Sequence, residues 1–188
     1  MATYIYEVTT VPVELITLSQ AKKQLKLDAT STVEDDILQG YIDAAIEVVE
    51  NYTSTSVNQQ KYKFALASFT ETFAFMRSPV VSIDSVKYYD VSDTLITLAS
   101  EKYELRQVDK YQSEIFFNDY DNIPTVSTTK SQPVEISVTT GYDATTLPKA
   151  IKQAILLLIG SFYENRQDTV EALPKATTNL LRKYRFHY

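Results

Sequence analysis

The sequence predicts an α+β fold: a small helical bundle of about four helices that carries an antiparallel β insertion between the second and third helices. Three observations predict it. Apolar residues recur at helical spacing near both ends of the chain, over residues 18–27, 33–52 and 148–166. Between about residues 57 and 140 the apolar period changes to two, as in half-buried strands. Turn signals separate these strands at short spacing, which favours antiparallel hairpins over crossovers.

The composition is that of an ordinary globular protein. The chain has 188 residues, of which 44% are hydrophobic and 22% charged, and no low-complexity linker interrupts it. We therefore expect one domain over 1–188, with a helical part at 16–56 and 142–188 and an inserted β part at 57–141. No apolar run is long enough to cross a bilayer, and the amino terminus lacks the pattern of a signal peptide. These features predict a cytoplasmic protein with no membrane partner.

The residues that usually carry chemistry are scarce. The chain has no cysteine and one histidine, His187, and none of its three glycines belongs to a phosphate-binding motif. The acidic stretch 119–122 lacks the glycine and the distal glutamate of a calcium loop, so we interpret it as a plain turn. We expect no catalytic residues, no metal and no cofactor.

The net charge and the number of aromatic residues indicate what kind of surface the protein has. A net charge of −6 argues against a protein that coats duplex DNA, because phosphate neutralisation needs clustered Lys and Arg. It suits a surface that DNA must pass without binding. Fourteen Tyr and eight Phe are a heavy aromatic load, and Tyr favours contact surfaces.

The first helix follows a short β-like segment within residues 1–16. Thr17 with Gln20 forms a capping box pattern that opens a helix over about 18–27. Its outer face is expected to be basic, with Lys22, Lys23 and Lys26.

The second helix, over about 33–52, has one apolar and one acidic stripe. Acidic residues occupy its first turn, where the helix dipole favours them. The acidic stripe continues through Asp43, Glu47 and Glu50, without lysines placed to pair with it. It is either a solvated face, or an acidic surface that faces a channel or the basic first helix of a neighbouring subunit.

The third helix, from Pro148 to Arg166, has the broadest apolar surface. Residues 154–159 are apolar at every position, so the helix must be covered on more than one side. We expect one face to pack on the second helix and Leu156 and Ile159 to remain for the β insertion or a neighbouring subunit. Gly160 in mid-helix suggests the close approach of another backbone. Glu164 and Arg166, at the polar end, form either a cap or a contact between subunits.

The carboxyl-terminal segment alternates cations with aromatic rings after a short last helix that begins near Pro174. It has three interpretations: a frayed terminus, a phosphate-binding segment that stacks bases, or an arm that docks on a partner. The candidate arm residues are Leu180, Leu181, Arg182, Lys183, Tyr184, Arg185, Phe186 and Tyr188.

Four stretches, taken in order, resemble a known family. They are ITLSQAKKQLKLD with EDDILQGYIDAAIEVVENYT, then SPVVSIDSVKYYD, then VEISVTTGYDATTLPKAIKQAILLLIGSFYENR. Together they resemble the head-tail connector, or adaptor, proteins of tailed bacteriophages and prophages, over about 16–166. One departure is that Gln132-Pro133 stands where members often carry a Trp-Pro pair.

The resemblance implies a structural virion protein of the neck and not an enzyme. Such adaptors form a dodecameric ring beneath the portal, extend the DNA channel, and join a head-closure or tail-completion protein. DNA passes through without sequence-specific binding, and the ring is assembled in the host cytoplasm. Carried onto this chain, the docking arm for the portal is Leu180 to Tyr188. The basic residues Lys22, Lys23 and Lys26 and the acidic residues Asp43, Glu47 and Glu50 are candidates for paired subunit faces, because neighbours in a ring make heterologous contacts.

Three other functions are considered. Within the structural class, the chain is alternatively a head-closure (stopper) or tail-completion protein, distinguished by whether it binds the portal directly. From other classes, the alternatives are a small hydrolase-like acid-base enzyme that uses Tyr and Asp or Glu, and a monomeric carbohydrate- or peptide-binding module.

Overall fold

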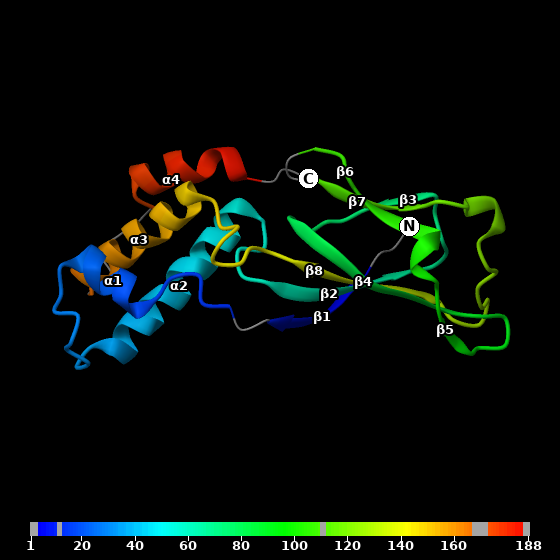
Figure 1. Cartoon of the computed structure of the whole chain (residues 1–188), viewed down its shortest axis with the longest axis horizontal. Coiled ribbons are helices and arrows are strands. Elements are labelled where there is room, and N and C mark those ends of the chain that lie inside the picture. The colour runs from blue at the N-terminus through cyan, green and yellow to red at the C-terminus, as the bar shows by residue number, and fades with distance from the viewer. Residues whose placement is uncertain (1–3, 11–12, 110–111, 167–172, 186–188) are drawn as a thin grey trace. The chain divides into compact units, whose positions relative to one another are not determined.

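The computed structural model describes residues 4–10, 13–109, 112–166 and 173–185. They belong to two compact units. The β unit comprises Met1–Val11 and Gln59–Gly141, and the helical unit comprises Pro12–Asn58 and Tyr142–Tyr188. Four α-helices and antiparallel sheets confirm the predicted α+β class (Figure 1).

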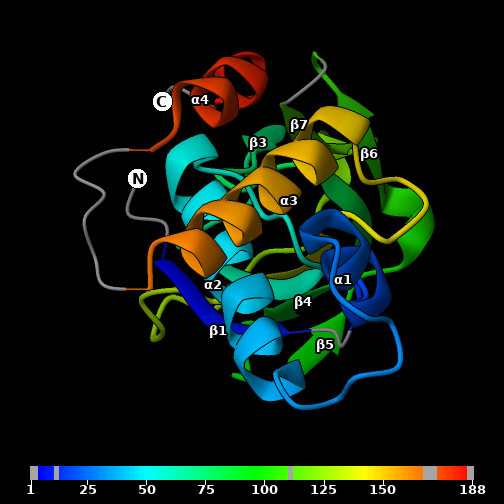
Figure 2. The same cartoon turned by 90° about the vertical axis from the view of Figure 1, so that its left-hand side faces the viewer.

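The helical unit is built around its third helix. Its members are α1 (Leu18–Leu25), α2 (Asp35–Thr53), α3 (Lys149–Glu164) and α4 (Lys175–Leu181), the last followed by the 3-10 turn η3 (Arg182–Tyr184). α3 contacts each of the other three helices, as Figure 2 shows. This arrangement explains why its apolar surface is broader than one stripe.

Local signals fix where these helices begin and end. The predicted capping box is confirmed, because Thr17 Oγ1 accepts from the Gln20 N–H at 3.2 Å and Gln20 Oε1 accepts from the Thr17 N–H at 3.4 Å. α1 and α2 end at Lys26 (φ 58°) and Ser54 (φ 56°), both in the left-handed conformation. The prolines Pro148 and Pro174 directly precede α3 and α4.

The core of the helical unit lies between α2 and α3. Ile42 and Val49 of α2, and Ile151, Ile155 and Leu158 of α3, are almost completely buried. Burial of each such side chain contributes about 1.5–3 kcal/mol to folding. The predicted packing of α3 on the apolar stripe of α2 is therefore confirmed.

Two expectations for α3 concern its outward residues. Ile159 is completely buried inside the chain, so the alternative that it remains for a neighbouring subunit is wrong, while Leu156 is half-buried. Among the described residues of this chain, nothing outside the adjoining helix backbone lies within 4 Å of a Cβ atom built at Gly160, so no other segment of them approaches it closely. The cost of glycine in a helix does not by itself indicate a close packing partner.

The β unit contains two antiparallel sheets. The first is five-stranded, in the order β1 (Tyr4–Thr10), β2 (Gln60–Leu66), β8 (Val134–Thr140), β4 (Val80–Tyr89) and β5 (Leu95–Thr97). The second is three-stranded, in the order β3 (Thr72–Ala74), β7 (Ser113–Phe117) and β6 (Tyr103–Gln107). Two 3-10 turns, η1 (Ser100–Lys102) and η2 (Tyr120–Asn122), flank the second sheet. β1 is the β-like segment predicted before the first helix.

Both sheets bury side chains in one core. In β8 the buried residues alternate strictly with half-buried ones, from Val134 to Thr140, as a period of two requires. The ring centroids of Phe64 and Phe75 lie 5.3 Å apart, and those of Phe69 and Phe117 lie 5.2 Å apart.

Within the described residues, no helix is long and apolar enough to cross a membrane.

Candidate functional site

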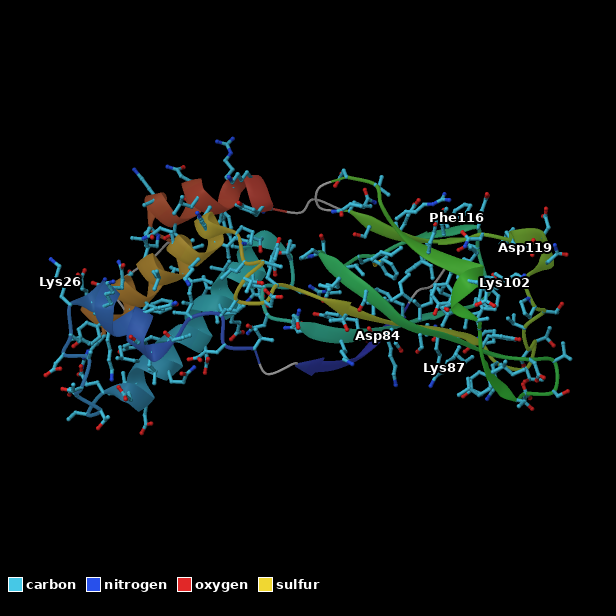
Figure 3. All side chains as sticks on the ribbon, viewed as in Figure 1. Lys26, Asp84, Lys87, Lys102, Phe116 and Asp119 are labelled. Carbon is cyan, nitrogen blue, oxygen red and sulfur yellow. The ribbon has the colours of Figure 1, made fainter. Side chains whose placement is uncertain are left out.

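The exposed cations of α1 are fewer than the sequence predicts. Lys22 is only 6% exposed, and its ammonium donates to the Ser31 carbonyl at 2.7 Å and pairs with Asp35 Oδ1 at 2.6 Å. The expectation that Lys22 lies on an outer basic face is therefore wrong. Lys22 therefore connects α1 to Ser31 of the following loop and to Asp35 in the first turn of α2. Lys23 and Lys26 are exposed, and Figure 3 shows Lys26 extending from the ribbon.

In the acidic stripe of α2, likewise, some of the predicted residues are exposed and one is bound inside the chain. Asp43 is exposed and accepts from Gln39 Nε2 at 3.0 Å, and Glu47 is also exposed. Glu50 is half-buried, and its Oε1 accepts from the N–H groups of Val57 at 2.7 Å and Asn58 at 3.0 Å. The expectation that Glu50 continues the outward stripe is wrong, because its carboxylate holds the loop that leaves α2.

The polar end of α3 is bound within the chain. Glu34, just before α2, accepts from the Tyr163 hydroxyl at 2.8 Å and from Arg166 Nη2 at 2.7 Å. These two hydrogen bonds lower the pKa of Glu34, the larger effect coming from Arg166. The Arg166 guanidinium also lies over the Tyr163 ring, 4.6 Å from its centroid. Arg166 therefore joins α3 to α2, whereas Glu164 is exposed.

Sequence reasoning missed this three-residue contact. The Tyr-Glu-Asn-Arg end of α3 and the acidic start of α2 were both visible as polar helix ends. An antiparallel packing of α2 and α3 would have brought them together, since the start of one helix then lies beside the end of the other. The sequence carried no signal for that direction of packing.

The candidate docking arm is partly a core element. Leu181 is completely buried and Tyr184 is 6% exposed, and Leu180 is half-buried. Arg182, Lys183 and Arg185 are exposed. The Arg185 guanidinium lies 5.6 Å from the centre of the Tyr52 ring, and the Lys183 ammonium lies 5.1 Å from that of Tyr184. Phe186 and Tyr188 lie outside the described residues.

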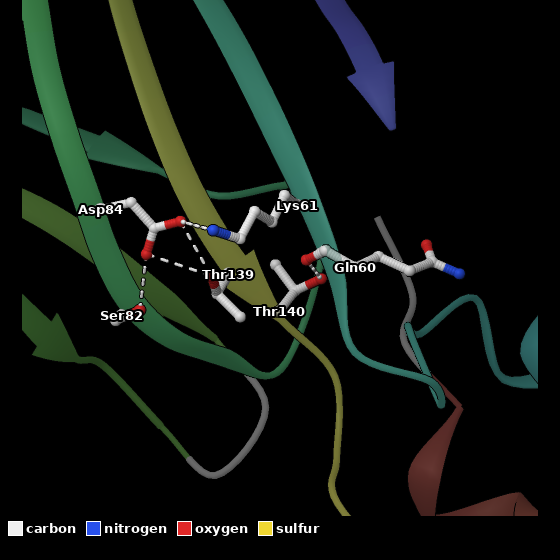
Figure 4. Close-up of polar contacts among 6 residues, drawn as sticks. All are labelled: Gln60, Lys61, Ser82, Asp84, Thr139 and Thr140. Carbon is white, nitrogen blue, oxygen red and sulfur yellow. Dashed lines mark hydrogen bonds and ion pairs between the residues drawn. The ribbon is translucent and has the colours of Figure 1, made fainter. Parts of the chain in front are cut away.

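A polar cluster lies across three strands of the five-stranded sheet (Figure 4). Asp84 of β4 accepts from the Ser82 hydroxyl at 2.9 Å and from the Thr139 hydroxyl of β8 at 2.9 and 3.0 Å. Lys61 Nζ of β2 lies 3.6 Å from Asp84 Oδ2. Because Lys61 and Ser82 both lie opposite Thr139 in the strand registers, these residues share one face of the sheet. The positive charge of Lys61 thus lies beside the negative charge of Asp84 within the cluster.

A second polar cluster surrounds the turn η2. Asp119 pairs with Lys102 Nζ at 2.8 Å and accepts from Asn122 Nδ2 at 2.8 Å, which lowers its pKa, the Lys102 bond having the larger effect. Figure 3 labels both Lys102 and Asp119. The turn borders a shallow cavity of about 270 Å³. Among the described residues, no group of three or more His, Cys, Asp or Glu is placed to hold a metal ion.

Residues 15–133 match the family described as phage gp6-like head-tail connector protein. The chain belongs to this head-tail connector family. A member of such a family is a structural protein and not an enzyme. Among curated proteins, none matches this connector significantly.

Three solved structures have the same fold as this connector. The neck of an empty GTA particle, computed with C6 symmetry, has 24% sequence identity and a TM-score of 0.78. The virion of a native gene transfer agent (GTA) particle has 25% identity and a TM-score of 0.76. The neck of a native GTA particle, computed with C12 symmetry, has 23% identity and a TM-score of 0.73. Each similarity covers 98% of this chain and 96% of the other.

Proposed function

We propose that this chain is a head-tail adaptor of the virion neck. It forms a homo-oligomeric ring beneath the portal, extends the DNA channel and joins the portal to a head-closure or tail-completion protein. The observation that carries the proposal is the connector family match over residues 15–133. The full-length similarity to a neck structure computed with C12 symmetry supports the ring. The ring is assembled in the host cytoplasm.

The proposed architecture of the subunit is one domain. The strands β2 to β8 form an insertion in the helical bundle, since they follow α2 and precede α3 in the chain. The chain passes between the two units at residues 11–12, 58–59 and 141–142. Several connections of this kind favour units that fold together over domains that fold separately.

The proposed contact between neighbouring subunits is electrostatic in part. A ring needs two different complementary faces on each copy. The exposed lysines Lys23 of α1 and Lys26, which directly follows that helix, supply one, and the exposed acids Asp43 and Glu47 of α2 supply the other. Lys22, Glu50 and Arg166 make contacts inside their own chain and do not belong to these faces.

The proposed relation to DNA is passage without adhesion. The net charge of −6 gives the ring a negative field that repels phosphate. Sequence reading needs base contacts from a positive surface, which this composition does not favour.

Native mass spectrometry with and without purified portal tests the function. We expect the chain to assemble into a ring on the portal, either from free monomers or from a preformed ring. A chain that stays monomeric with portal present would contradict the adaptor function. Binding to an assembled portal-adaptor complex, but not to portal alone, would instead indicate the head-closure or tail-completion role.

The docking arm requires a test that leaves the core intact. Truncation before Arg182 would remove the buried Tyr184, so a loss of attachment would not distinguish docking from misfolding. We expect Arg182→Ala, Lys183→Ala and Arg185→Ala together to weaken portal attachment at least about tenfold, because Arg is a frequent anchor of interfaces. The melting temperature is expected to change little, since all three side chains are exposed. Unchanged attachment would show that this segment does not dock.

A further inference from the structure

Residues 182–185, the last that the structure describes, continue α4 as a folded part of the helical unit. The Arg182 N–H donates to the Thr178 carbonyl, and the turn η3 follows without a break. Leu181 is completely buried and Tyr184 is 6% exposed. α4 contacts both α3 and α2, and Figure 2 shows it beside the end of α2. The fold therefore fixes where the backbone of this segment lies.

The cations of the segment reach solvent. Arg182, Lys183 and Arg185 are exposed, whereas Tyr184 between them is buried. Among the described residues, none of the three cations forms an ion pair or a side-chain hydrogen bond. A cation without an acidic partner in its own chain is available to a carboxylate of another protein.

Arg185 has a contact with another helix. Its guanidinium carbon lies over the Tyr52 ring, 5.6 Å from the ring centroid, and Tyr52 is half-buried in the last turn of α2. Arg185 itself follows η3 with an extended backbone (φ −70°, ψ 120°), beyond the last helical turn. A cation in this position is attracted by the quadrupole of the ring. Tyr52 therefore limits where the charge at the end of the segment can lie.

This limit lowers the entropic cost of binding through Arg185. A free arginine side chain occupies many rotamers, and a partner that binds it must restrict them. A guanidinium that a ring already holds has lost part of this freedom before the partner arrives. The ring contact uses no acceptor atom, so the N–H groups of the guanidinium remain available for a carboxylate.

We infer that Tyr52 is a positioning residue for the portal contact. Its ring holds the Arg185 guanidinium where an acidic group of the portal binds it, and Tyr52 acts through Arg185 without touching the portal itself. The inference rests on the proposed adaptor function, in which residues 182–185 dock on the portal. It adds to that contact a residue of α2, far from the docking segment in the sequence.

A double-mutant cycle tests the inference. The variants are Tyr52→Leu, Arg185→Ala and the two together, and native mass spectrometry gives the concentration of each at which purified portal is half occupied. Tyr52→Leu should raise this concentration about two- to fivefold, because the contact of the ring with the cation is lost. In the Arg185→Ala background it should change nothing further, since no guanidinium then remains for the ring to hold.

Two further variants separate positioning from a general effect on α2. Tyr52→Phe retains the ring and should bind portal as the unmodified chain does. Tyr41→Leu is the matched control, because Tyr41 is half-buried in the same helix and its ring lies 6.2 Å from that of Phe162. It should leave portal binding unchanged, while its melting temperature shows what the loss of a half-buried tyrosine does to the fold.

Nuclear magnetic resonance tests whether the contact exists before the portal binds. In the free chain, the side-chain protons of Arg185 should show a ring-current shift that Tyr52→Leu abolishes and Tyr52→Phe preserves. Identical Arg185 shifts in the unmodified chain and in Tyr52→Leu would overturn the inference, because the guanidinium would then not be held in advance.

Three outcomes of the binding cycle would also overturn it. Unchanged binding by Tyr52→Leu would show that the ring does not position the cation, and tighter binding would show that Arg185 must leave the ring to dock. An equal loss with and without Arg185 would show that Tyr52 acts directly or through the fold. Failure of the adaptor function is seen separately, as the absence of portal binding by the unmodified chain, and would overturn this inference with it.

Discussion

Lys22 and Asp35 form an ion pair in which the lysine is buried and the aspartate is partly exposed. The Lys22 side chain is 8% exposed and that of Asp35 is 24% exposed, and the ammonium also satisfies the Ser31 carbonyl. Removal of one member of such a pair leaves the other charge with neither partner nor full hydration. The pair therefore matters more to the fold than the exposed lysines beside it.

Lys22→Met should lower the free energy of unfolding by about 2–3 kcal/mol, less than for a fully buried pair because Asp35 retains some contact with water. The measurement is urea denaturation at neutral pH. Lys23→Met is the matched control, since Lys23 is exposed in the same helix, and should change the unfolding free energy by less than about 0.5 kcal/mol. Equal effects of the two substitutions would show that the Lys22 pair does not stabilise the fold.

The turn that leads into α3 is organised by a single carboxylate. Asp143 Oδ1 accepts from the N–H groups of Thr145 and Thr146, both at 2.7 Å, and from their hydroxyls at 2.7 and 3.0 Å. These hydrogen bonds, of which that from the Thr145 hydroxyl has the largest effect, lower the pKa of Asp143 from 3.8 to about 2. The carboxylate is thus bound most strongly in its charged form, and the start of the central helix depends on its charge.

The lowered pKa of Asp143 predicts how its contribution depends on pH. Because the folded pKa lies below the unfolded one, the stabilisation is complete above about pH 4 and is lost as the pH falls toward 2. Asp143→Ala should therefore lower the melting temperature by a few degrees, roughly 2–5 °C, at pH 7, and by much less near pH 2. Asp121→Ala, an exposed aspartate of η2, is the control. A melting difference that is constant from pH 7 to pH 2 would contradict this role.

Elements with a local signal were predictable from the sequence, and so was the apolar packing of α3 on α2, whereas the polar contacts between elements were not. The capping box at Thr17, the proline before α3 and the alternation in β8 each mark one element by the chemistry of neighbouring residues. Lys22 appeared basic and outward because its partner Asp35 belongs to another helix. Glu50 was misread because its carboxylate binds the loop that follows its own helix, and periodicity does not distinguish a charged residue that faces water from one that has a partner in the chain. For Arg166 the sequence left a cap and a contact between subunits open, and the structure shows its contact with Glu34.

At the scale of the whole molecule, the ring requires that each copy meet its neighbours through unlike faces. Of the six residues predicted for these faces, Lys23, Lys26, Asp43 and Glu47 are exposed, whereas Lys22 and Glu50 make contacts inside the chain. A heterologous interface of opposite charges has a consequence that an interface of like faces lacks. Consider two variants, each with the charges of one face reversed. Neither variant should form rings alone, but a mixture of the two should.

The prediction uses Asp43→Lys with Glu47→Lys as one variant and Lys23→Glu with Lys26→Glu as the other. Each variant alone brings like charges together at every contact, so ring formation should weaken at least tenfold. In an equal mixture, alternating copies place opposite charges at every contact, and a ring with an even number of subunits can close. Native mass spectrometry with or without portal measures the rings, and the mass difference between the variants reveals their alternation.

The control carries two reversals outside the proposed faces, Glu101→Lys with Asp121→Lys, both exposed residues of the β unit. It changes the net charge as much as the first variant does and should still form rings alone. The effect of the reversed faces should also diminish as salt rises from about 0.05 to 0.5 M, since exposed charges are screened. Rings formed by each reversed variant alone, or no rings in the mixture, would show that these residues do not pair subunits, while attachment to portal would still be decided by its own measurement.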